Sequence, residues 1–190
     1  MTVAQDKSYS FEEYVAHLTQ SEQRYELVDG SLVEMNPPTF RHLLIAKFLE
    51  KQFDAKIQSG QQPWLAFREA GVRTGLRKSR LTDVYVLHRD QVSEMLDESA
   101  ICQTAPILIV EVISPDSVSR DYRHKRSEYA ALGVQEYWVV DPIEEKVTVF
   151  LLSDGLYEEN VFAEEAVIAS RVFPNLQLSV NTVFASGNLP

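Results

Sequence analysis

Residues 107–113 read Ile107-Leu-Ile-Val-Glu-Val-Ile113, an apolar run that only Glu111 interrupts. Pro106 precedes the run, and Ser114-Pro115 follows it. A short segment so rich in isoleucine and valine, bounded by turn residues, predicts a strand that is buried on both faces. We therefore expect a central strand of a sheet with helices packed on both sides.

The rest of the chain mixes helix and strand signals. Ser10 and Glu13 form a capping box before an amphipathic segment, and Asp29-Gly30 separates two short strand-like runs, which predicts a hairpin. Further signals predict a helix through residues 45–57 that ends at Gly60, strands at 66–74, 81–88 and 137–140, a helix capped by Ser119 and ending at Leu132, a hairpin of 146–152 with 156–162, and a short strand with a closing turn within 167–184. These elements predict an α/β fold: a mixed central β-sheet flanked by helices, with additional hairpins, in one domain over residues 1–190.

The composition is that of an ordinary globular protein. Apolar residues make up 45% and charged residues 24% of the 190 residues. No apolar run is long enough to span a bilayer, so we expect no membrane contact. Cys102 is the only cysteine, which excludes an intrachain disulfide and a cysteine-rich zinc site. We expect a cytoplasmic protein.

The formal net charge of −10 argues against a nucleic-acid partner, but the basic residues are clustered. Half of the 18 lysines and arginines lie in two short stretches, opposed locally only by Glu69 and Asp121. One stretch holds Arg68, Arg73, Arg77, Lys78 and Arg80, and the other holds Arg120, Arg123, Lys125 and Arg126. Two basic patches on an acidic body could bind phosphates, although two solvated basic faces explain the charge pattern equally well.

Two carboxylates are candidates for a site. Glu111 has apolar neighbours on either face of its strand, and an unpaired buried carboxylate costs several kcal/mol, so it needs a cation, a metal ion or a proton. A core salt bridge to an arginine would meet the same need. Asp83 begins a second apolar strand on the face shared with Tyr85, where it could also be only a turn residue.

Lys125 favours the functional interpretation. Tyr122, Lys125, Tyr129 and Leu132 recur at helical spacing and form the stripe that their helix buries. That helix follows the strand of Glu111 after one short loop, so the ammonium group can reach the carboxylates. A lysine whose stem is buried while its ammonium stays in water, or an i,i+4 pair with Asp121, is the simpler alternative.

Two carboxylates and an ammonium group suit metal-assisted phosphodiester hydrolysis. Asp83, Glu111 and a backbone carbonyl offer oxygen ligands to Mg²⁺ or Mn²⁺, and the ion would lower the pKa of a bound water. Lys125 would orient the water or stabilise the phosphate in the transition state.

With Asp83, Glu111 and Lys125 in this order, the sequence resembles the restriction-endonuclease-like superfamily, whose motif is Pro-Asp…(Asp/Glu)-X-Lys, written PD-(D/E)XK. More closely, it resembles a large bacterial family of restriction-endonuclease-like proteins once labelled a domain of unknown function. The matching segments are Arg24-Tyr-Glu-Leu-Val-Asp-Gly30, His42, Thr82-Asp-Val84, Val110-Glu-Val-Ile-Ser-Pro115, Asp121-Tyr-Arg-His-Lys125 and Gly133-Val-Gln-Glu-Tyr-Trp-Val-Val-Asp-Pro142. They run in family order along nearly the whole chain.

The resemblance implies roles for particular residues. Asp83 and Glu111 would be metal ligands with the Val112 carbonyl as a third, and Glu26 would be an auxiliary acid, although an exposed hairpin residue is the alternative. Lys125 would be the motif lysine moved to the helix, because Ile113 occupies its usual place on the strand. Thr82 replaces the usual proline before Asp83.

We therefore predict a Mg²⁺- or Mn²⁺-dependent endonuclease that acts on DNA as a homodimer, with Arg77, Lys78, Arg80 and Arg123 contacting phosphates. One alternative is a nucleic-acid-binding or regulatory module that keeps the fold with little catalysis. Another is a metal-free core with a buried Glu111–arginine pair, which would leave Asp83 remote from Glu111.

Overall fold

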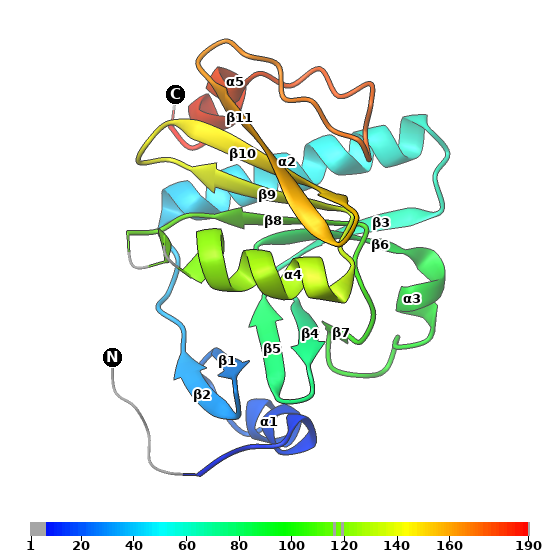
Figure 1. Cartoon of the computed structure of the whole chain (residues 1–190), viewed down its shortest axis with the longest axis vertical. Coiled ribbons are helices and arrows are strands. Elements are labelled where there is room, and N and C mark those ends of the chain that lie inside the picture. The colour runs from blue at the N-terminus through cyan, green and yellow to red at the C-terminus, as the bar shows by residue number, and fades with distance from the viewer. Residues whose placement is uncertain (1–6, 116, 119, 190) are drawn as a thin grey trace.

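The computed structural model describes residues 7–115, 117–118 and 120–189, which form two mixed β-sheets with helices packed against them (Figure 1). The larger sheet has six strands in the order β11-β10-β9-β8-β6-β3. Their bounds are β3 (Trp64–Arg68), β6 (Val84–His88), β8 (Leu108–Val112), β9 (Glu136–Asp141), β10 (Lys146–Ser153) and β11 (Leu156–Ala163).

The apolar run at 107–113 forms the central strand β8, as its composition predicts. All residues of β8 are buried, and the strand pairs parallel with β9 and antiparallel with β6. Its alternate side chains enter two different cores, Val110 on one face and Ile109 on the other. A strand buried on both faces needs apolar residues at every position, which explains the continuous run around Glu111.

Helices cover both faces of this sheet. The long helix α2 (Phe40–Ser59) packs Leu49 and Phe53 into one core, together with α5 (Val180–Ala185). The π-helix η1 (Arg120–Lys125) continues into α4 (Arg126–Leu132), which packs Tyr129 into the core on the other face. The mixed α/β architecture agrees with the predicted fold class.

The smaller sheet has the strand order β2-β1-β5-β4-β7 and lies at the lower end in Figure 1, next to α1 (Phe11–Leu18). Its strands are β1 (Tyr25–Val28), β2 (Ser31–Glu34), β4 (Gly71–Gly75), β5 (Lys78–Leu81) and β7 (Ile101–Cys102). The capping box of Ser10 and Glu13 is present, as predicted. The β1–β2 hairpin turns at Asp29 and Gly30, whose φ angles of 49° and 84° suit the Asp-Gly pair.

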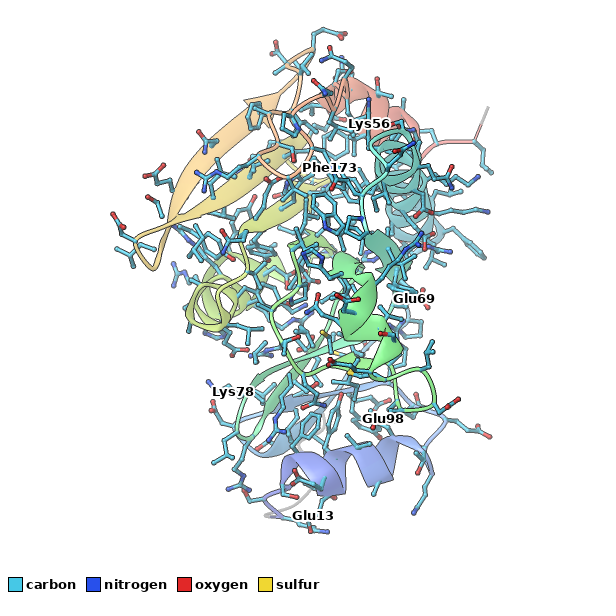
Figure 2. All side chains as sticks on the ribbon, turned by 90° about the vertical axis from the view of Figure 1, so that its right-hand side faces the viewer. Glu13, Lys56, Glu69, Lys78, Glu98 and Phe173 are labelled. Carbon is cyan, nitrogen blue, oxygen red and sulfur yellow. The ribbon has the colours of Figure 1, made fainter. Side chains whose placement is uncertain are left out.

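The two strands predicted at 66–74 and 81–88 are each divided between the sheets. Glu69 has a φ of 58° and separates β3 from β4, while Thr82 and Asp83 separate β5 from β6. Across the break, the Thr82 N–H donates to the Ala70 carbonyl (2.9 Å) and the Glu69 N–H donates to the Asp83 carbonyl (3.3 Å). Asp83 therefore lies where the chain passes from one sheet to the other. In Figure 2, Glu69 lies at mid-height between them.

Other boundaries also differ from the sequence prediction. The predicted helix 119–132 begins as a π-helix, and its predicted cap, Ser119, lies outside the described residues. The C-terminal segment forms α5 and an isolated bridge between Val167 and Ser179 instead of a strand. The short helix α3 (Arg89–Ser93) was not predicted. None of the described helices is both long enough and apolar enough to cross a bilayer.

Candidate active site

Glu111 lies in the middle of β8 with a side chain that is only 3% exposed. Its Oε2 atom is 2.8 Å from the Lys125 Nζ atom, and its Oε1 atom accepts a hydrogen bond of 2.7 Å from the Tyr129 hydroxyl. Tyr129 belongs to α4, which packs over β8. The buried partner of Glu111 is thus a lysine and not the arginine that the metal-free alternative supposed.

Lys125 brings the acids together. Its ammonium group lies 3.3 Å from Glu26 Oε1 and 3.4 Å from Asp121 Oδ1, and it donates to the Leu81 carbonyl at 3.2 Å. Lys125 is the last residue of the π-helix, whose i→i+5 hydrogen bonding is rare and is found frequently at functional sites. Both Asp121 and Lys125 face inward from this turn.

Asp83 occupies the position opposite Glu111 on the neighbouring strand. Val84 pairs with Val110 in the antiparallel β6–β8 ladder, so one step before β6 places Asp83 across from Glu111. Asp83 Oδ2 accepts from the Val112 N–H at 2.7 Å, and Oδ1 lies 2.9 Å from His42 Nε2 in the first turn of α2. The Asp83 side chain is 22% exposed and borders the buried cluster.

Glu26 is fully buried in β1, which excludes the alternative of an exposed hairpin residue. Besides Lys125, it binds the Arg80 guanidinium through Oε2 at 2.9 Å, and its Oε1 accepts from the Leu81 N–H at 3.2 Å. Arg80 also forms a two-point ion pair with Glu128 of α4. Glu26 therefore belongs to the same cluster as Glu111.

The prediction that Arg80 contacts phosphate does not fit this arrangement. Arg80 is only 2% exposed, and two carboxylates occupy its guanidinium group. The clustering of basic residues between Arg68 and Arg80 had suggested that Arg80 lies on the surface. Alternation along β5 instead turns it inward, opposite Glu26, because Leu27 pairs with Ser79 in the adjacent step of the ladder.

The electrostatic environment differs between the acids. Burial raises the pKa of Glu111 well above its ordinary value, and the nearby charges of Asp83 and Asp121 raise it further against the effect of Lys125. Burial also raises the pKa of Glu26, but Lys125 and Arg80 outweigh it, so the net pKa is lowered. For Lys125, burial is outweighed by Glu111, Glu26 and Asp121, which raise the pKa above its ordinary value. Lys125 is thus held in its charged form.

Carboxylates and cations alternate in this cluster. Four carboxylates, Glu26, Glu111, Asp121 and Glu128, share two buried cations, Lys125 and Arg80, and two partly exposed cations lie at its edge, with Arg120 Nε 3.8 Å from Asp121 and Lys78 Nζ 3.7 Å from Glu128. The buried Oδ1 atom of Asp121 has no hydrogen-bond partner among the described residues. Within residues 7–115, 117–118 and 120–189, no set of three or more His, Cys, Asp or Glu side chains is arranged to hold a metal ion. A site here would instead combine two carboxylates with backbone carbonyl and water oxygens, a donor set that suits Mg²⁺ or Mn²⁺.

The remaining predicted phosphate contacts lie nearer the surface. Arg77 and Lys78 line an open pocket of about 530 Å³ between the β4–β5 hairpin and α4, whose other lining residues are Asp29, Thr74, Gly75, Leu76, Ser127, Glu128 and Ala131. Figure 2 shows Lys78 below α4. Lys78 pairs with Asp29 at 3.1 Å and lies 3.7 Å from Glu128, and Arg77 donates to the Tyr9 carbonyl. Arg123 is exposed on η1.

The sequence did not assign three residues to the cluster. It offered Asp121 only as an i,i+4 partner of Lys125, a pair that the structure has at 3.4 Å, and it gave Glu128 no role. Tyr129 was placed on the buried stripe of its helix without its bond to Glu111. The signal that could have found Glu128 is the guanidinium of Arg80. An arginine that faces inward beside Glu26 has donors left for a second carboxylate, and Glu128 supplies it.

Comparisons with known proteins relate this arrangement to a family. A crystal structure from Anabaena variabilis, described as a "putative nuclease belonging to DUF820", has a TM-score of 0.78 and 24% sequence identity, covering 94% of this chain and 99% of that one. This similarity shows a common fold. The type IIG restriction endonuclease BpuSI is 11% identical over 80% of this chain and 17% of that one, and its TM-score of 0.41 is too low to indicate a shared fold. No curated protein matches.

The sequence itself gives a broader match. Residues 11–181 match the family model Uma2, described as "Putative restriction endonuclease". That range includes Glu26, Asp83, Glu111 and Lys125. Because the match spans most of the chain, the protein belongs to the Uma2 family.

Proposed function

We propose that this protein is a metal-dependent nuclease that hydrolyses phosphodiester bonds in DNA. Membership of the Uma2 family, whose description is "Putative restriction endonuclease", supports a nuclease. The observation that carries the assignment is the buried contact between Lys125 and Glu111, with Asp83 on the adjacent strand. Metal-assisted hydrolysis needs carboxylates that can bind the ion and a fixed positive charge that stabilises the phosphate in the transition state. This cluster provides both kinds of group.

Asp83, Glu111 and the Val112 carbonyl would hold one Mg²⁺ or Mn²⁺ ion, with waters completing its coordination. When bound, the ion lowers the pKa of a coordinated water and screens the charge of the scissile phosphate. The environment of Glu111 supports this proposal: burial and the nearby charges of Asp83 and Asp121 raise its pKa, so an additional cation beside it would keep it ionised in its buried position.

Lys125 acts as a fixed positive charge in this proposal. Its raised pKa means that it keeps its proton at neutral pH, so it does not serve as a general base. The ammonium group orients the attacking water or stabilises the charge that develops on the phosphate. Glu26 Oε1 lies 3.3 Å from the ammonium group and Glu111 Oε2 lies 2.8 Å from it, so the two acids together limit how far it can move.

DNA would be bound by the basic residues that remain near the surface, Arg77, Lys78 and Arg123. We infer, from the family resemblance and the composition, a cytoplasmic homodimer, and one domain over residues 1–190. The alternative function is a nucleic-acid-binding module with little catalysis. One observation favours it: both oxygens of Glu111 and both of Asp83 already bind protein donors.

A cleavage assay distinguishes the two functions. Purified protein is incubated with supercoiled plasmid or single-stranded DNA in Mg²⁺, in Mn²⁺, or in chelator. The nuclease should nick or linearise DNA only with a divalent ion. Binding without cleavage under every condition would support the module and contradict the enzyme.

A further inference from the structure

We propose that Arg80 is a positioning residue that fixes Lys125 and Glu26 by joining α4 to the five-stranded sheet through Glu128. The inference rests on the proposed nuclease function, because it assigns to Arg80 a part in holding the same site. It replaces the role in phosphate binding that the basic run suggested.

The first half of this arrangement lies within the sheet. Arg80 on β5 faces Glu26 on β1, and its Nη1 atom donates to Glu26 Oε2 at 2.9 Å. The other oxygen of Glu26 accepts from the Leu81 N–H and lies 3.3 Å from Lys125 Nζ. Since both oxygens are bound, Glu26 has one orientation, and that orientation presents Oε1 to the ammonium group.

The second half joins the sheet to the helix. Arg80 Nε donates to Glu128 Oε2 at 2.8 Å, and Nη2 donates to Glu128 Oε1 at 2.6 Å, which is the two-point geometry that arginine makes with a carboxylate. The Thr74 hydroxyl on β4 donates to the same Oε2 at 2.8 Å. Glu128 is therefore held by two neighbouring strands of the five-stranded sheet.

This attachment sets the rotation of the helix at Lys125. Glu128 lies three residues after Lys125, within one helical turn. The π-helix ends at Lys125, and its i→i+5 bonding is less favourable than α-helical bonding, so contacts outside the helix must hold it. If the Glu128 contact were lost, the turn could relax and move Lys125 away from Glu111 and Glu26.

The geometry requires arginine. The planar guanidinium presents five donors in a fixed fork and here uses three of them on two carboxylates. A lysine at position 80 has a single ammonium group and cannot bind both oxygens of Glu128 while binding Glu26.

The test compares Glu128→Gln and Arg80→Lys with Glu50→Gln. The control variant breaks the Arg68–Glu50 ion pair (2.6 Å), which lies in α2 and β3 outside the cluster. Glu128→Gln keeps the size of the side chain but removes its charge, and Glu128 is partly exposed, so this variant should fold. Hydrogen exchange of amides in β9 and β10 verifies that the core of each variant is intact.

Two readouts follow. Pulse acetylation with mass spectrometry measures how readily the Lys125 amine reacts, and it needs no DNA cleavage. Both site variants should raise Lys125 labelling above that of the parent and of Glu50→Gln. In the cleavage assay, both should lower kcat by roughly 10- to 100-fold, the range for residues that orient a catalytic group, with KM for DNA little changed.

The readouts separate this inference from the proposed function. If the parent cleaves DNA and the site variants match it in labelling and in kcat, the positioning role is wrong and the nuclease assignment stands. If the parent does not cleave DNA, raised Lys125 labelling in the two site variants alone still supports the positioning role, and unchanged labelling overturns it.

Discussion

Glu111 is an acid that the fold buries at an energetic cost. It is enclosed between β8 and α4 beside Lys125, with the like charges of Asp83 and Asp121 nearby. Residues held in costly environments are typical of functional sites, where a ligand offsets the cost. Its presence could be predicted from the sequence because a lone carboxylate in an apolar strand is conspicuous.

Glu111→Gln tests this cost through pH. Because burial raises the pKa of Glu111 in the folded chain, the folded state binds a proton more tightly than the unfolded state does. The Glu111 contribution to stability is therefore present below the unfolded pKa of about 4.3 and is lost as the pH rises through the folded pKa.

The variant cannot titrate at this position. Without divalent ions, its free energy of unfolding should fall less than that of the parent as the pH rises above about 4.5. Urea unfolding across the pH range measures the difference. Parallel curves for parent and variant would contradict the raised pKa.

Lys125→Ala tests the division of roles. Lysine is not a metal ligand, so the variant should lose cleavage while it retains Mn²⁺ binding. It leaves Glu26 and Glu111 without their shared cation, which costs about 3–5 kcal/mol of stability, so folding is verified by circular dichroism. Isothermal titration with Mn²⁺ reports binding. Loss of the ion, or cleavage equal to the parent, would show that the role is wrong.

At the scale of elements, the passage between the two sheets positions Asp83. The chain leaves β5 at Leu81 and enters β6 at Val84, so Asp83 lies at the start of a strand that pairs with β8. Thr82 secures this passage with two bonds to the Ala70 carbonyl, one from its N–H and one from its hydroxyl (3.0 Å). The departure from the motif proline thus has a structural use in this chain.

Thr82→Pro should therefore destabilise the protein, although it restores the motif. Proline removes both donors and leaves the Ala70 carbonyl without them, at a cost of about 1–3 kcal/mol, whereas Thr82→Val removes only the hydroxyl and costs about 1 kcal/mol. Denaturant unfolding of the two variants gives the comparison. Equal stability of the proline and valine variants would refute this account of the passage.

Local patterns predicted the hairpins and the central strand, but they did not predict how strands divide between sheets. Residues 66–74 contain no Asn-Gly or Asp-Gly pair that would indicate a turn at Glu69, yet the structure has a positive φ of 58° there. The spacing of Lys125 and Tyr129 indicated the buried stripe, and i,i+4 counting indicated the Asp121–Lys125 pair. Neither indicated that the π-helical turn buries both members of that pair.

For the whole molecule, the net charge of −10 is compatible with DNA only if basic residues act locally. Screening limits the influence of distant charges to roughly 8–10 Å at ordinary salt. The sequence showed where basic residues cluster, yet Arg80 and Lys125 form buried ion pairs with Glu26 and Glu111 and do not reach the surface. Charge counting cannot distinguish a buried ion pair from a surface patch, since that depends on which strand lies opposite.

Arg123→Ala tests the surface contribution. If Arg123 contacts one phosphate, the variant should lower the slope of log K against log salt by about 0.9 in magnitude and weaken binding to all sequences alike. Arg89→Ala is the matched control, because Arg89 follows β6 at the end opposite Asp83 and is also exposed. Fluorescence anisotropy at several salt concentrations measures both slopes. Equal slopes for the two variants would remove Arg123 from the interface.

Crystals grown with Mn²⁺ test the central claim most directly, because anomalous scattering locates the ion independently of activity. We predict one peak at about 2.0–2.2 Å from a carboxylate oxygen of Asp83 and from one of Glu111, with the Val112 carbonyl beside it. The contrary result is a crystal grown at saturating Mn²⁺ that shows no ion between Asp83 and Glu111 and in which Lys125 and Tyr129 still bind both oxygens of Glu111. That result would contradict a metal-dependent site.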